Sequence, residues 1–141
     1  MPNMDIDEMR EFIGEGTRTG HLATVREDGR PHVAPIWFLI DGEDIVFTSW
    51  HDTVKVRNIL RTGYAALSVD EPSSPYSFVV LEGTVTVDRD PAASRYWATE
   101  AGRRYMGEDR ADEFGERNGV DGEWVFRLRP VHWTGVRNIA E

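Results

Sequence analysis

The stretch Gly20–Ile40, which reads GHLATVREDGRPHVAPIWFLI, indicates the fold class of this chain. Two segments that suit β-strands, Gly20–Arg26 and Pro31–Ile40, flank the short polar sequence EDGR. Within that sequence Asp28-Gly29 is a strong hairpin signal, because glycine and aspartate tolerate the backbone angles of a tight hairpin turn. We therefore expect an antiparallel hairpin in which each segment is one strand.

The alternation continues outward from this hairpin. A second turn at Asp41-Gly42 leads into the strand Asp44–Ser49, and three further strands are expected at Tyr64–Val69, Tyr76–Val87 and Gly122–Trp133. Helical spacing of apolar residues predicts helices at Asp5–Ile13, Thr53–Arg61 and Pro91–Met106, whereas the polar, charged segment Met106–Asp121 is expected to be loop with some helix. This pattern predicts one domain over residues 1–141, mainly β with flanking helices, as a small six-stranded antiparallel barrel.

Composition limits the function classes. The net charge of −9 disfavours a nucleic-acid partner, which requires a basic face, and the absence of cysteine removes disulfides and thiolate chemistry. The four histidines lack the spacing of a zinc site, so no metal is expected. No apolar run approaches the ~20 residues of a membrane helix and the N-terminal residues are acidic, so we expect a cytoplasmic protein.

The segment FTSWHDTVKVRN, residues 47–58, is the best local signal for chemistry. It contains Lys55, the only lysine of a chain whose other fifteen basic residues are arginines. Two hydroxyl residues, Thr48 and Ser49, end a strand, and a helix then begins with Thr53 or Asp52 as its N-cap. A helix N-terminus with nearby cations favours a phosphate. An ordinary solvated helix with two cations would give the same pattern.

Aromatic residues lie close to this segment. Trp37 is on the second expected strand and Trp50 ends the third, so their rings would be able to stack on a flat ligand. Most aromatic residues at such positions belong to a core. No serine elbow or other nucleophile motif is present, and the catalytic residue stays unknown.

Together these stretches resemble the split-barrel flavin family that includes pyridoxamine 5′-phosphate oxidase, and they look closest to its actinobacterial branch of reductases that depend on the deazaflavin coenzyme F420. The segments that carry the resemblance are LATVREDGRPHVAPIWF, DIVFTSWHDTVKVRNILR, YAALSVDEPSSPYSFVVLEGTVTV and FRLRPVHWTGVRN, within residues 8–137. The resemblance implies a homodimeric split β-barrel.

It also implies a set of cofactor-binding residues. The strand His32, Val33, Ala34, Pro35, Ile36 and Trp37 would lie along the tricyclic ring, and Thr48, Ser49, Trp50, Thr53, Lys55, Arg57 and Asn58 would surround the phosphate. The second subunit would contribute Ser77 and Phe78, and Trp133 and Arg137 match a tryptophan and an arginine that the oxidase branch places beside FMN. Lys55 would then be retained as a phosphate ligand.

One departure concerns the substrate. The basic residues that the oxidase branch uses for the phosphate of pyridoxamine phosphate have no match here, which favours the deazaflavin branch. The expected reaction is hydride transfer from reduced F420 to a conjugated or unsaturated small molecule of quinone, tetrapyrrole or enone type. Two alternatives stay open: an FMN-dependent flavoprotein similar to pyridoxamine phosphate oxidase, and a non-catalytic carrier of F420 or FMN.

Overall fold

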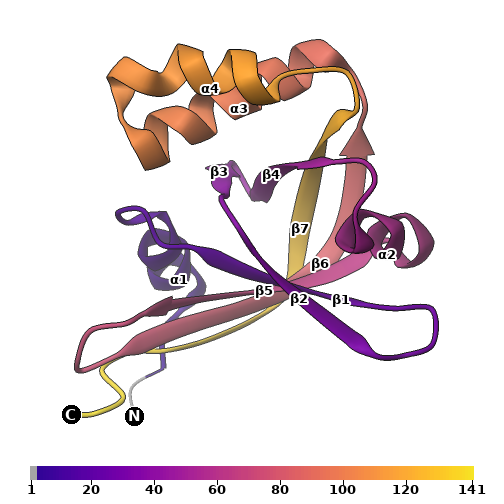
Figure 1. Ribbon diagram of the computed structural model, residues 1–141. Helices are drawn as coiled ribbons and strands as arrows, with labels where there is room; N and C mark the ends of the chain where they lie inside the picture. The colour runs from indigo at the N-terminus through magenta and orange to yellow at the C-terminus, as the bar shows by residue number, and fades with distance from the viewer. Residues whose placement is uncertain (1–2) are drawn as a thin grey trace.

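The computed structural model describes residues 3–141, in which the chain runs through eleven regular elements and one 3-10 turn (Figure 1). In chain order these are α1 (Ile6–Gly14), β1 (Gly20–Val25), β2 (Pro31–Ile36), β3 (Leu39–Asp41), β4 (Asp44–Trp50), α2 (Val54–Thr62), β5 (Tyr64–Glu71), β6 (Ser77–Asp88), α3 (Pro91–Met106), the 3-10 turn η1 (Glu108–Arg110), α4 (Ala111–Asn118) and β7 (Glu123–Val136). The expectation of a mainly β, antiparallel chain with flanking helices is confirmed.

The strands form one sheet in the order β2-β1-β5-β6-β7-β4-β3, and all neighbours are antiparallel. β2 and β3 lie at opposite edges of this sheet, yet only Trp37 and Phe38 separate them in sequence. The sheet must therefore curl until its two edges approach each other, although they do not pair. We call the gap between β2 and β4, at the place where these edges approach, the seam. The arrangement is an open, split barrel.

The expectation of six strands was wrong, because Pro31–Ile40 is two strands and the sheet has seven. The break falls at Phe38, whose ring is fully buried. The backbone N–H and C=O groups of Phe38 form hydrogen bonds with side chains of α3, whereas in a continuous strand a neighbouring strand would supply the partners. The Phe38 N–H donates to the Tyr105 hydroxyl over 3.2 Å, and Arg104 donates to the Phe38 carbonyl oxygen over 2.5 Å.

The segment Met106–Asp121, expected to be loop with some helix, is more helical than expected. Most of this segment is η1 and α4, and α4 packs along α3, as Figure 1 shows above β3 and β4. Ala111 and Phe114 are buried and have the i, i+3 spacing of one helix face. The Phe114 ring lies 5.7 Å from the Trp37 ring, centroid to centroid. An isolated apolar pair among so many charged residues gave little sign of a helix.

The core lies inside the curl of the sheet. Its largest fully buried side chains include Phe38, Phe47, Phe126, Leu67 and Leu81. Phe47 and Phe126 are paired across β4 and β7, and their rings stack at 5.3 Å. These two strands form one wall of the seam, so the core fixes the position of β4 there.

Helix α2 begins and ends at specific capping residues. The Thr53 hydroxyl accepts a hydrogen bond from the Val56 N–H over 3.4 Å, which fixes the first turn. Gly63 ends the helix with a φ of 65°, a left-handed conformation that glycine adopts at little cost. These caps place Lys55 in the first turn of the helix. Within residues 3–141, no helix is both long and apolar enough to cross a membrane.

Candidate functional site

A cavity of about 250 Å³ lies at the seam. Residues of β2 and of β4 face it from the two sheet edges, α2 contributes Lys55, and α3 covers it. The lining residues are Pro35, Ile36, Trp37, Leu39, Val46, Phe47, Thr48, Lys55, Trp97, Ala98, Ala101, Asn118 and Glu123. Most of them are apolar, and three of the four polar residues, Thr48, Lys55 and Glu123, lie close to one another, which is the usual make-up of a small-molecule site.

Lys55 is half-buried in this cavity. Burial lowers the pKa of its ammonium group, and the Glu123 carboxylate offsets part of that decrease. Among residues 3–141, no acceptor forms a hydrogen bond or ion pair with Lys55. A partly desolvated cation without a partner is unfavourable, so this position favours an anionic ligand.

The arginines differ from Lys55 in this respect. Each of the fifteen contacts an oxygen atom or an aromatic ring of the protein. Arg104, for example, donates to the carbonyl oxygens of Ile13, Gly16 and Phe38. Within the described part of the chain, Lys55 is therefore the one basic residue without a protein partner.

His32 lies near Lys55 on the inner face of β2. Its Nδ1 atom is buried and has no hydrogen-bond partner among the described residues. Burial lowers the pKa of the imidazole, and the positive charges of Arg26 and Lys55 lower it further. His32 thus adds an unpaired buried nitrogen close to Lys55, although it does not line the cavity.

The backbone of the seam is also open. β2 is an edge strand whose only neighbour is β1, and the residues Phe47–Trp50 of β4 pair with β7 on one side alone. The other sides of both strands carry peptide N–H and C=O groups that no strand covers. Alternate residues of β2 turn these groups to the open edge, so part of this backbone can hydrogen-bond to a ligand, although Pro35 has no N–H. The Val33 side chain is exposed on the outer face of the sheet, whereas Pro35 is exposed and also lines the cavity.

The expected phosphate residues occupy different surroundings. Ser49 is buried, and its hydroxyl donates to the Trp50 carbonyl oxygen over 3.0 Å. Thr48 lines the cavity and Thr53 caps α2. Asn58 is buried too, and its amide donates to the Thr24 hydroxyl over 3.0 Å. Thr48 is therefore the hydroxyl that faces the cavity, while Ser49, Thr53 and Asn58 hold the neighbouring backbone and α2.

Arg57 and Arg61 point away from the cavity. Arg57 is exposed and pairs with Asp52 at 2.8 Å. Arg61 donates to the Asn58 amide oxygen over 3.3 Å and to the carbonyl oxygen of Val25 at the end of β1. Neither arginine lines the cavity, so Arg57 would have to leave Asp52 before it could reach a ligand there.

The two tryptophans of the site have different neighbours. The Trp37 indole stacks on Tyr105 with a centroid distance of 4.9 Å and nearly parallel planes, so α3 covers one of its faces. Trp50 is about half exposed, and its ring tilts against His51 at 4.6 Å. One face of Trp37 therefore belongs to the packing of α3.

Four of the expected residues lie elsewhere. Ser77, Phe78, Trp133 and Arg137 are at the far end of β6 and β7, where Phe78 pairs with Val136. The Ser77 hydroxyl accepts a hydrogen bond from the Asn138 N–H, and Arg137 pairs with Glu8. Glu123 and Val136 are the two ends of the 14-residue strand β7, which spans up to about 40 Å. A single chain therefore does not bring these four residues to the seam.

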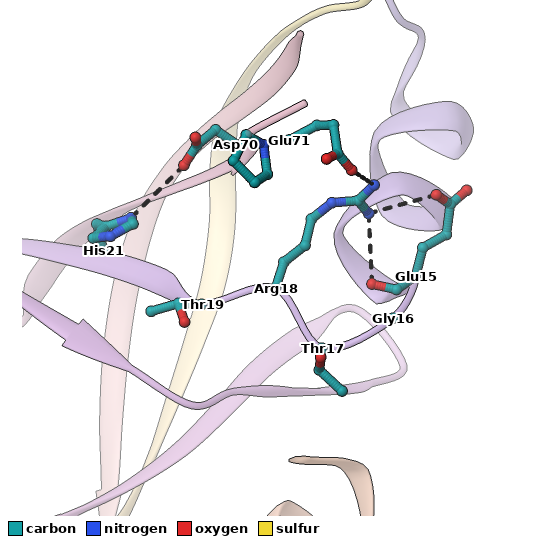
Figure 2. A pocket seen from close by; sticks show the side chains of 9 residues that line it. Glu15, Gly16, Thr17, Arg18, Thr19, His21, Asp70 and Glu71 are labelled. Atoms are coloured by element: carbon teal, nitrogen blue, oxygen red, sulfur yellow. Dashed lines mark hydrogen bonds and ion pairs between the residues drawn. The ribbon is translucent and has the colours of Figure 1, made fainter. Parts of the chain in front are cut away.

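A larger groove near that far end has a different character. Its volume is about 620 Å³, and its lining includes Arg18, His21, Asp70 and Glu71 (Figure 2). Arg18 donates to Glu71 over 2.8 Å and to the Phe12 carbonyl oxygen over 2.6 Å, while His21 lies 4.0 Å from Asp70. Its charged groups face one another, unlike Lys55 at the seam.

Sequence reasoning missed several residues of the cavity. Trp97, Ala98 and Ala101 come from α3, which was expected as a helix but was not placed over the seam. Glu123 begins β7 opposite Trp50, and a contact between strands so distant in sequence is not visible in local patterns. Trp97 and Ala101 have i, i+4 spacing and so lie on one face of the helix. This apolar pair was the sign in the sequence that this face of α3 packs against another part of the protein.

Comparison with known proteins agrees with this fold. The sequence profile described as pyridoxamine 5′-phosphate oxidase matches residues 6–137, which is nearly the whole chain. The chain belongs to the pyridoxamine 5′-phosphate oxidase family. The resemblance inferred from the sequence motifs is thereby confirmed. No curated protein sequence is similar enough to match the chain.

Solved structures of similar proteins include an F420 reductase, which is 34% identical over 87% of this chain and 94% of its own, with a TM-score of 0.69. A conserved hypothetical protein from Mycobacterium tuberculosis is 19% identical over 98% of this chain and 89% of its own, with a TM-score of 0.82. A heme storage protein from Vibrio cholerae is 21% identical, covers 90% of each chain and has a TM-score of 0.68. The last two show the shared fold alone.

Proposed function

We propose that this protein is an oxidoreductase that binds reduced coenzyme F420 at the seam and uses it to reduce a conjugated or unsaturated small molecule. The observation that carries the proposal is Lys55, a half-buried cation without a protein partner in a cavity between two open strand edges. The 34% identity to an F420 reductase over most of both chains supports the deazaflavin as the cofactor.

The residues present suit the cofactor's phosphate. The Lys55 ammonium would bind it, next to the first turn of α2, whose N–H groups and dipole also favour an anion. The unpaired Nδ1 of His32 and the hydroxyl of Thr48 offer hydrogen bonds in the same region. The Lys55 ammonium would gain a partner when a phosphate binds, which is why the site fits it.

The ring of the cofactor would lie along β2. The open backbone groups of residues 32–37 would orient it, and the Trp37–Tyr105 stack would hold the end of that strand in place. When bound, a reduced deazaflavin supplies a hydride. The contribution of the protein is to fix the ring and the acceptor in one geometry and to exclude water between them.

A second subunit would complete the site. Ser77, Phe78, Trp133 and Arg137 are too distant along β7 to reach the seam of their own chain, so they would act on the seam of a partner. The outer face of the sheet offers a surface for such a dimer, because Val33 and Val80 are exposed there beside the small residues Ala23 and Ala66. A two-fold interface would cover this face in both copies.

Titration of the apo-protein with F420 and with FMN, followed by fluorescence, tests the proposal. We expect F420 to bind more tightly, and a dimer with two equivalent sites in sedimentation at micromolar concentration. Tighter binding of FMN would assign the protein to the FMN-dependent alternative. Tight binding of F420 without turnover of quinone, tetrapyrrole or enone acceptors would make it a carrier. A stable monomer that binds the cofactor would overturn the shared site.

A further inference from the structure

The seam cavity contains one acidic residue, Glu123, and it lies in the same polar end as Lys55. Glu123 is the first residue of β7 and pairs with Trp50 of β4. Burial raises the pKa of its carboxyl group, while the Thr48 hydroxyl and the Lys55 ammonium lower it in part. Within residues 3–141, Glu123 and Lys55 form no ion pair at 4 Å or less, so space separates them.

This pair of charges has a consequence for any anion that enters. Lys55 attracts it and Glu123 repels it, in a small, partly desolvated cavity where charges are weakly screened. The attraction and the repulsion both increase with the charge of the ligand. Because the positive and negative groups are balanced, a second negative charge on the ligand gains little net attraction, and it must still lose its own hydration.

We propose that Glu123 makes the seam selective for a phosphate with a single negative charge, that is, a phosphodiester, over a phosphomonoester. This inference rests on the proposed function. A phosphomonoester carries about −1.5 to −2 charges at pH 7 because its second pKa is near 6, whereas a phosphodiester carries one. FMN ends in a monoester. The phosphate of F420 is esterified on both sides, to the ribityl chain and to the lactyl group.

Glu123 thus gives the chain a physical basis for the choice between two cofactors whose rings have the same shape. Lys55 alone would favour FMN, since the dianion is attracted more strongly to a lone ammonium group. The carboxylate reverses that order. In this scheme Glu123 sets specificity and touches no reacting atom.

The test separates ligand charge from ring structure. Affinities are measured by fluorescence for F420, for FMN and for the FMN monomethyl ester, which has the FMN ring and one negative charge. The variants are Glu123→Gln, which keeps the shape and removes the charge, and Glu123→Thr, a neutral residue that suits a strand. Glu43→Gln is the control, because Glu43 is exposed in the β3–β4 turn, does not line the cavity and changes the net charge equally.

We expect both neutral variants to bind FMN about tenfold more tightly than the wild type and to leave the methyl ester and F420 within about threefold. The control should change all three affinities alike. The ratio of the affinity for FMN to the affinity for its methyl ester is compared between the wild type and each folded neutral variant. If this ratio is the same, Glu123 does not discriminate between ligands by their charge and the inference is wrong. If the wild type binds neither F420 nor FMN, the proposed function itself fails.

Discussion

A basic side chain is half-buried at two places in the molecule: Lys55 at the seam, and Arg104 where α3 meets α1 and the β2–β3 link, which we call the corner. The two side chains differ in whether the protein supplies them with hydrogen-bond partners. At the seam, Lys55 is half-buried and has no partner among residues 3–141. At the corner, Arg104 is also about half-buried, but its guanidinium donates to three carbonyl oxygens, those of Ile13, Gly16 and Phe38. The arginine joins α1, the β2–β3 link and α3. The difference shows that burial of a cation does not by itself mark a ligand site, because a half-buried cation can be fully paired within the protein.

The largest effect is expected at the corner. Arg104→Ala leaves three carbonyl oxygens without their donor, so the free energy of unfolding should fall by about 2–4 kcal/mol. Chemical denaturation measures this loss. Arg104→Lys, which keeps the charge but lacks the planar fork, should recover only part of it. A variant that keeps its stability but no longer binds F420 would make Arg104 a ligand residue and break the comparison.

At the seam the expected effect is on binding and not on folding. Lys55→Ala removes a charge-assisted contact worth about 1.5–3 kcal/mol, so the affinity for the cofactor should drop roughly 10- to 100-fold. The melting temperature should not fall, since the lost cation has no protein partner. Fluorescence titration and a thermal melt measure the two quantities.

Arg61→Ala on the same helix is the matched control for Lys55→Ala. Arg61 donates to the Val25 carbonyl oxygen and to Asn58, so its loss should lower stability slightly and leave affinity unchanged. A selective loss of F420 affinity in this variant would instead place the tail of the cofactor along α2. An unchanged affinity of Lys55→Ala for both cofactors would exclude a phosphate at the seam.

The smallest effect concerns pH and another paired group. The Arg129 guanidinium beside Asp44, with help from Arg127, holds the pKa of the Asp44 carboxyl below its usual value. A lowered pKa in the folded state stabilises the protein above the unfolded pKa of about 4, and this contribution is lost as the pH falls through the folded value. Asp44→Asn should therefore lower stability at pH 7 by about 1 kcal/mol and flatten the decline below pH 4. Urea denaturation at pH 7 and pH 3 shows whether the two proteins converge in acid.

Local patterns predicted much of this fold. The alternation around Asp28-Gly29 and the capped helix after Thr53 both have short-range causes, and the structure confirms both elements. The lone Lys55 was singled out from residue usage alone. Its place in a cavity was not visible in the sequence, because α3 and the start of β7 complete that cavity from far along the chain.

The errors in strand number and in the extent of helix after Met106 have a common origin, namely contacts between segments that are far apart in the sequence. Nothing near Phe38 in sequence indicates that Tyr105 and Arg104 form hydrogen bonds with its peptide N–H and C=O groups. These bonds divide one expected strand into two. Likewise, α4 depends on Phe114 packing near Trp37, a contact between segments about 80 residues apart in number. The same long-range contacts decide which residues line the seam, so Glu123 was missed for the same reason.

The position of β7 in the sheet bears on how the protein is made. β7 pairs with β6 on one side and with β4 on the other, and without it the sheet falls into two pieces, β2-β1-β5-β6 and β4-β3. Yet it is the last of the seven strands in sequence, so it is synthesised after the other six. A nascent chain holding every residue up to Asn118 has β2 and β4 but not the strand that joins their two parts of the sheet. The cavity at the seam, which Glu123 of β7 helps to line, is therefore complete only after β7 has been synthesised and has paired with β4 and β6.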